Sequence, residues 1–145
     1  MILVIFSFMM RRGRWQSLEL IGYRVDALPT ASQPLQLTLW WRGMRPAAED
    51  WTAFFHLTPL GNDHELLGRM GQAITAHAYP LPVWSSPGEV VVDYAQFSAA
   101  NLAAGSYVVW MGMYPPFTKV RATVAAEIVV VSEARARLVE FQLAL

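Results

Sequence analysis

The sequence predicts an all-β fold, an antiparallel two-sheet sandwich with an immunoglobulin-like or jelly-roll-like arrangement. Three observations support this prediction. Short runs rich in Val, Leu, Tyr, Trp and Phe recur along the chain, which is typical of strands. Clusters of Pro, Gly, Asn, Asp and Ser separate these runs, and such clusters form turns. Several runs alternate apolar and other residues with a period of two, the repeat of a β-strand.

Taken in chain order, eight runs are predicted as strands: residues 18–26, 35–42, 51–58, 65–72, 89–97, 106–114, 123–131 and 137–143. The turn clusters between them are residues 28–34, 43–50, 59–64, 79–88, 98–105 and 115–121. Helix is indicated only weakly, at residues 47–50 and 99–104. Seven or eight strands at this spacing in 145 residues are typical of one sandwich domain.

The N-terminal segment that runs from Met1 to Met10 (MILVIFSFMM) is almost wholly apolar, and Arg11, Arg12 and Arg14 follow it. It has about half of the roughly 20 apolar residues that a membrane-spanning helix needs. Its basic cluster follows the apolar run, whereas a secretory signal has its positive charge first. Two interpretations stay open: a strand or anchor that packs on the domain or a partner, or the end of a longer apolar segment. We therefore divide the chain into an anchor or packing segment, residues 1–14, and a sandwich domain, residues 15–145.

The period of two assigns a face to each strand residue. Within residues 35–42, Trp41 shares one face with three leucines, which predicts a core position, and Trp40 points the other way. The same reasoning places Phe55, Tyr107 and Val109 between the two sheets.

The outward faces are unusually apolar for an antiparallel sandwich, whose outer faces are normally polar. The large outward side chains are Trp40, Phe54, Val108, Trp110 and Tyr114. A contiguous exposed apolar patch usually marks an interface with a protein or a membrane. We expect this set to be covered, either within the chain by a loop or by the segment from Met1 to Met10, or by another subunit or lipid.

The composition excludes several classes of protein. The chain is 54% hydrophobic and only 15% charged, with a formal net charge of zero and a mean hydropathy of +0.30. Intrinsic disorder needs low hydrophobicity and high net charge, and nucleic-acid binding needs a basic excess. Because the chain has no Cys, it has neither disulfides nor thiolate metal sites.

The search for catalytic or metal-binding motifs gives no candidate. The three histidines, His56, His64 and His77, are not spaced as an HxH or HExxH pair. His56 lies in a predicted strand between two apolar residues and is interpreted as structural. Asp63 and Glu65 belong to a turn, where calcium would need further oxygen ligands from elsewhere. No nucleophile elbow or phosphate-binding glycine loop is present. We expect no enzyme activity, no metal and no cofactor.

A series of short matches resembles a known bacterial domain. These include LQLTLWWR at residues 35–42, DWTAFFHL at residues 50–57, PGEVVVD at residues 87–93, and GSY at residues 105–107. The pattern is similar to the β-sandwich domains that follow multi-pass membrane glycosyltransferases of the mannosyltransferase type. The resemblance covers roughly residues 18–131 and implies an accessory, non-catalytic sandwich on the extracytoplasmic side of a membrane.

Two functions follow as expectations. The first is a non-catalytic interaction subunit that docks onto a larger membrane-associated assembly, with protein partners and a possible lipid contact through the segment from Met1 to Met10. The second is a carbohydrate-binding accessory module linked to glycosyl transfer, in which Trp84 is the predicted sugar contact. A sugar site needs an exposed aromatic ring flanked by polar donors, whereas a protein or lipid interface needs apolar neighbours.

Overall fold

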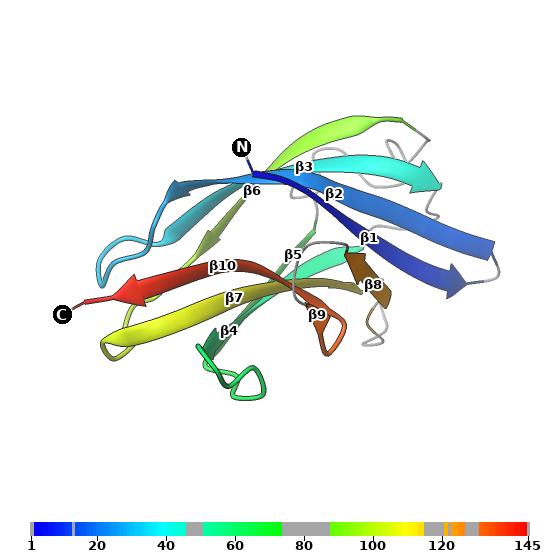
Figure 1. The fold of residues 1–145 in the computed structure, drawn as a ribbon. Coiled ribbons are helices and arrows are strands. Elements are labelled where there is room, and N and C mark those ends of the chain that lie inside the picture. Colours follow the sequence, from blue (N-terminus) through cyan, green and yellow to red (C-terminus); the bar gives the residue numbers. More distant parts are fainter. Residues whose placement is uncertain are drawn as a thin grey trace.

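The structure is a computed structural model that describes residues 2–12, 14–45, 51–73, 88–114, 121, 123–126 and 131–144. These residues form two five-stranded sheets that face each other (Figure 1). The strand order in the first sheet is β6 (Val90–Phe97), β3 (Leu35–Arg45), β2 (Arg14–Ala27), β1 (Ile2–Arg12) and β8 (Thr123–Ala126). The order in the second sheet is β5 (Gly68–Ala73), β4 (Thr52–Pro59), β7 (Gly105–Tyr114), β10 (Arg135–Leu143) and β9 (Val131–Ser132).

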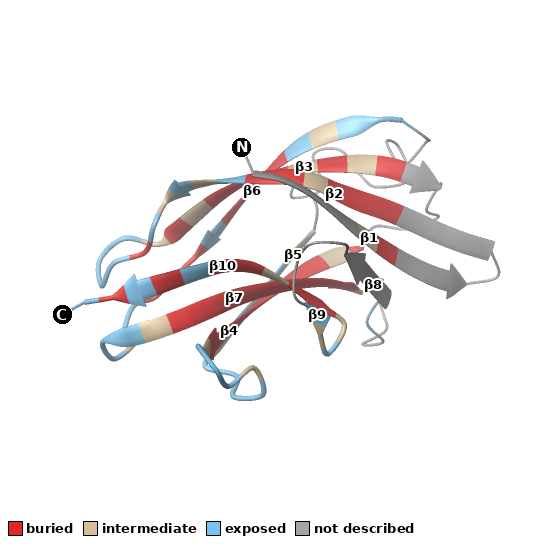
Figure 2. Ribbon diagram, viewed as in Figure 1, coloured by how far each residue is buried: buried red, intermediate tan, exposed pale blue. Residues whose placement is uncertain are grey.

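Every pairing between these strands is antiparallel, so the predicted fold class is confirmed. The core lies between the sheets, where the facing strands are buried along much of their length (Figure 2). Trp41, Phe55, Tyr107 and Val109 all belong to this core, as the period of two predicts. Trp40 is only partly buried and lies on the other face of β3, which confirms the register of that strand.

The N-terminal segment is an inner strand of the first sheet. Strand β1 pairs with β2 on one side and with β8 on the other. Phe8 is fully buried in the core, and its ring centroid lies 5.9 Å from that of Trp41. Residues 2–12 and 14–27 are therefore hydrogen-bonded neighbours in one sandwich.

Two predicted elements differ from those observed. The sequence predicted a single strand for residues 123–131. The start of this range is β8 of the first sheet and its end is β9 of the second, so the prediction of one continuous strand is wrong. The weak helix at residues 99–104 is a turn, in which Asn101 has a φ of 68°; the other weak helix, at residues 47–50, lies outside the described residues. Within the described ranges, no helix is long and apolar enough to cross a membrane.

Candidate functional site

The outer face of the second sheet is built from aromatic and polar side chains of β4 and β7. Register pairs His56 with Trp110, Phe54 with Gly112, and Thr58 with Val108. The Phe54 ring lies over Gly112, where an added Cβ would stand 2.1 Å from its Cζ atom. Only a glycine at this position of β7 therefore leaves room for the Phe54 ring.

Three of the five residues predicted to form an apolar interface are buried within the chain. Phe54 is 5% exposed, Val108 2% and Trp110 4%, whereas Trp40 and Tyr114 are half-buried. Strand β1 belongs to the other sheet, so the segment from Met1 to Met10 does not lie over β4 and β7. These three side chains are therefore covered within the chain, which is one of the outcomes that the sequence left open, and strand β1 is not what covers them.

Arginine side chains lie over two of these aromatic rings. The Arg135 guanidinium carbon lies 5.1 Å from the Trp110 ring centroid, and that of Arg121 lies 5.0 Å from the Phe54 ring centroid. Both geometries are cation–π contacts. Trp110 also donates its indole N–H to the Thr58 hydroxyl at 2.9 Å, so its one polar atom is satisfied.

Arg135 is the centre of a hydrogen-bond network at this face. Its side chain is 2% exposed. It donates to the Glu133 carboxylate at 2.8 Å, to the Asp63 carbonyl at 2.7 Å and to His56 Nδ1 at 3.1 Å. Burial lowers the pKa of Arg135, and the Glu133 carboxylate opposes that shift. A buried charge of this kind is tolerated because it is paired and hydrogen-bonded.

The turn between β9 and β10 places Glu133 next to Arg135. Glu133 and Ala134 have φ values of 54° and 55°, the left-handed region required at both central residues of a type I′ hairpin turn. Such turns favour Asn-Gly, so Glu-Ala is a strained choice. Sequence reasoning missed Arg135 and Glu133 as site residues because no Asn-Gly or Asp-Gly signal marks this turn.

His64 links the β4–β5 loop to the same turn. Its Nδ1 lies 2.9 Å from a Glu133 carboxylate oxygen, and its Nε2 lies 3.6 Å from Asp63. The Glu133 carboxylate raises the pKa of His64, and the Ser132 hydroxyl lowers the pKa of Asp63. In the part of the chain that the structure describes, no three His, Asp or Glu side chains are grouped so as to hold a metal ion.

The outer face of the first sheet is the more exposed of the two. On β6, Tyr94 is 70% exposed, Val90 49% and Val92 43%. Across the β3–β6 pairing, Tyr94 lies opposite Thr38, and Val92 lies opposite Trp40. An exposed tyrosine ring and a half-buried tryptophan therefore share one stretch of surface.

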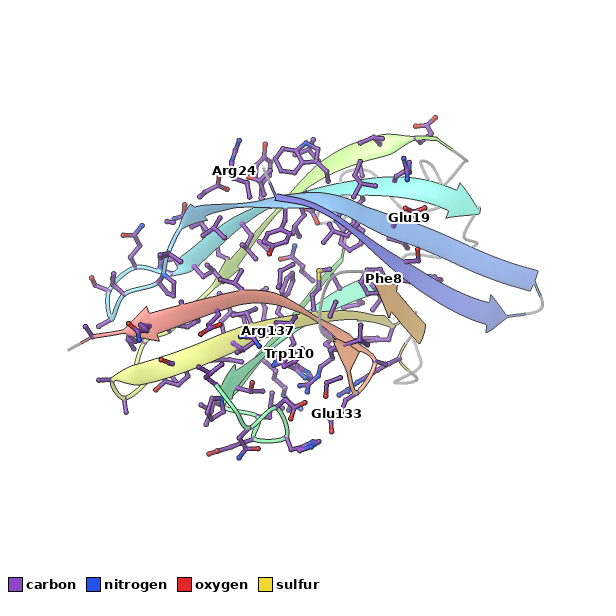
Figure 3. All side chains as sticks on the ribbon, in the orientation of Figure 1. Phe8, Glu19, Arg24, Trp110, Glu133 and Arg137 are labelled. Atoms are coloured by element: carbon purple, nitrogen blue, oxygen red, sulfur yellow. The ribbon has the colours of Figure 1, made fainter. Side chains whose placement is uncertain are left out.

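Charged and polar groups from β2 and β3 adjoin these rings. The Arg24 guanidinium carbon lies 5.6 Å from the Trp40 ring centroid, and Arg24 projects from the outside of this sheet (Figure 3). Arg24 and Thr38 both donate to the Asp26 carboxylate, each at 2.6 Å, and these bonds lower the pKa of Asp26. The network holds the Arg24 side chain beside Trp40.

Trp84, the predicted sugar contact, lies outside the described residues, and so does the third histidine, His77.

Together, the fold and these two surfaces define an antiparallel two-sheet β-sandwich module. No protein-family model and no curated protein matches the sequence. The structure is similar to the crystal structure of the C-terminal domain of Wzt, with a TM-score of 0.56 and 12% sequence identity. The likeness covers 96% of this chain and 78% of that one, and at this identity it shows a shared fold. The resemblance to glycosyltransferase accessory domains stays a prediction.

Proposed function

We propose that this chain is a non-catalytic carbohydrate-binding module and that its binding face is the outer face of the first sheet. The observation that carries the proposal is the 70% exposed ring of Tyr94, which lies near Trp40 and a fixed polar network. The similarity in fold to the Wzt C-terminal domain is compatible with a sandwich module that binds a ligand on one of its faces.

The chemistry of the surface suits a sugar. A pyranose ring presents an apolar C–H face and a rim of hydroxyl groups. An exposed aromatic ring can pack against the apolar C–H face. The hydroxyl groups need hydrogen-bond partners on the protein to replace the water that they lose. The Arg24 side chain is 54% exposed and that of Asp26 is 28% exposed. They supply donors and an acceptor beside Trp40, and the Gln36–Gln96 pair supplies amides beyond Tyr94.

The face is organised before any ligand arrives. Thr38 is buried and donates to Asp26, which in turn accepts from Arg24. At the edge of β6, Gln72 of β5 donates to the Tyr94 carbonyl at 3.0 Å and so holds the backbone that presents the tyrosine ring. Preorganisation of this kind reduces the entropy lost on binding.

The test is glycan binding by the full chain and by Tyr94→Ala. We expect the full chain to bind at least one oligosaccharide class on a glycan array, and Tyr94→Ala to weaken that binding by about tenfold or more. The matched control is Leu28→Ala, which removes another exposed apolar side chain from a loop. Equal binding by the wild type and Tyr94→Ala, or no glycan bound by either, would contradict the proposal.

The exposed valines favour a second candidate. Val90 and Val92 extend the Tyr94 surface with apolar area, which supports docking onto a protein. A membrane-associated, extracytoplasmic assembly is the setting that the resemblance to glycosyltransferase accessory domains implies. A photocrosslinker at position 92 tests this in cells. Docking predicts a discrete crosslinked protein that is lost in Val90→Ser, whereas glycan recognition predicts loss of glycan binding in Tyr94→Ala and no discrete crosslink.

A further inference from the structure

Two arginines lie on the outer face of the second sheet without an ion pair to a carboxylate in the described part of the chain. Arg69 of β5 lies directly across from His56 in the β4–β5 register. Arg121 lies over the Phe54 ring and donates to the Glu133 carbonyl at 2.8 Å. Both side chains are exposed, and within the described residues neither forms an ion pair with Asp or Glu.

The acidic groups of this region are already engaged elsewhere. Glu133 pairs with Arg135 and His64. Asp63 accepts from the Ser132 hydroxyl and lies near His64. Glu133 is near enough to Arg121 to interact with it electrostatically, but its ion pairs are with Arg135 and His64. Among the described residues, neither Arg69 nor Arg121 therefore has an ion-pair partner of its own.

His56 adds a directed donor near these two charges. An arginine can only donate, so His56 Nδ1 accepts from Arg135 and the ring proton must sit on Nε2. The Nε2–H group forms no hydrogen bond with the described part of the chain. The His56 ring lies 4.8 Å from the Phe54 ring, over which Arg121 sits, and Arg69 is its cross-strand neighbour.

We propose that His56, Arg69 and Arg121 form a binding site for one oxyanion group, a phosphate or a carboxylate carried by a ligand. The two guanidinium groups supply charge and forked donors, the form of cation best suited to such anions. The imidazole N–H supplies a third donor from a ring whose orientation Arg135 fixes. The site lies on the opposite sheet from Tyr94, so it extends the proposed function and does not depend on it.

The neutral state of His56 agrees with this assignment. Burial, together with the charges of Arg121, Arg135 and Arg69, lowers the pKa of His56 to about 4. A bound anion would oppose those charges and raise the pKa of His56.

The test is an NMR titration of the full chain that follows the His56 ring nitrogens. Sodium phosphate is added in one series and sodium acetate in another, with sodium chloride at equal ionic strength as the baseline. We expect a saturable change at Nε2 with phosphate, acetate or both, and at least a fivefold weaker affinity in Arg69→Gln and Arg121→Gln. The control Arg137→Gln removes the same charge from an ion pair with Glu140 on the same sheet and leaves the affinity unchanged.

The two anion series distinguish the sources. Saturation by phosphate alone assigns a phosphate group, and saturation by acetate alone assigns a carboxylate. If neither anion shifts Nε2 beyond chloride, or if Arg137→Gln weakens binding as much as Arg69→Gln and Arg121→Gln do, the site is refuted. Arg69→Lys and Arg121→Lys keep the charge, so they retain part of the affinity even where a Gln variant fails to fold.

Discussion

At the scale of single residues, His56 makes this fold sensitive to acid. Its ring is buried beside Arg135, and its pKa is lowered to about 4 from the usual 6.5. The unfolded chain therefore binds a proton between these values that the folded chain does not. Lowering the pH from 7 to 5 should reduce the free energy of unfolding by about 1–2 kcal/mol through this group.

Urea unfolding of the wild type and of His56→Gln, at pH 7 and pH 5, measures this effect. Glutamine keeps an acceptor for Arg135 but does not titrate. His64 has the opposite sign, because its raised pKa stabilises the fold at low pH and loses that contribution as the pH rises through its folded pKa. The same pH dependence in His56→Gln as in the wild type would show that His56 is not the source.

At the scale of secondary-structure elements, β1 should be required for stability. Phe8 is fully buried against Trp41, whereas its neighbour Ser7 is half-buried on the other face of the strand. Phe8→Ala should lower the free energy of unfolding by about 3–5 kcal/mol. Ser7→Ala, the matched control in the same strand, should change it by only about 0.5 kcal/mol. Denaturant unfolding of both variants decides this, and equal stability of the two would mean that β1 is not an inner strand.

Local sequence pattern predicted the strands and their inward faces. In β3, the alternation identified Trp41 as buried and Trp40 as the outward residue, and both follow from sterics within one strand. Pairing between distant segments could not be predicted in this way. The separation of residues 123–131 between two sheets depends on contacts that no local period encodes.

The burial of the outward aromatic residues could not be predicted from the sequence either. Phe54 and Trp110 alternate outward as predicted, yet Arg121 and Arg135 lie over them from segments far along the chain. Arg135 reaches its position through a hairpin turn formed by Glu133 and Ala134 at positive φ, a choice that turn preferences disfavour. The exposed face of β6 was not predicted, because a run of valines followed by Tyr94 is equally typical of a strand in a core.

At the scale of the whole molecule, the two sheets should unfold as one unit. Each sheet contains strands from both halves of the sequence, because β6 and β8 join β1, β2 and β3 in the first sheet, and β7, β9 and β10 join β4 and β5 in the second. Neither half of the sequence therefore contains a complete sheet. Tyr23 of β2 crosses between the sheets and donates its hydroxyl to the Leu138 carbonyl of β10. Burial raises the pKa of this tyrosine, which keeps its hydroxyl protonated as a donor. Small domains with a single shared core usually unfold in one cooperative transition.

Removing the Tyr23 hydroxyl tests this coupling. Tyr23→Phe leaves the Leu138 carbonyl without this donor and should lower the free energy of unfolding by about 1–2 kcal/mol. The transition should nevertheless stay single, because the apolar core that both sheets share is unchanged. Tryptophan fluorescence reports on both sheets, since Trp41 lies in β3 and Trp110 in β7, and far-UV circular dichroism reports on all strands. Coincident curves from the two probes are expected for the wild type and for Tyr23→Phe, and separate midpoints in the wild type would show that each sheet unfolds independently.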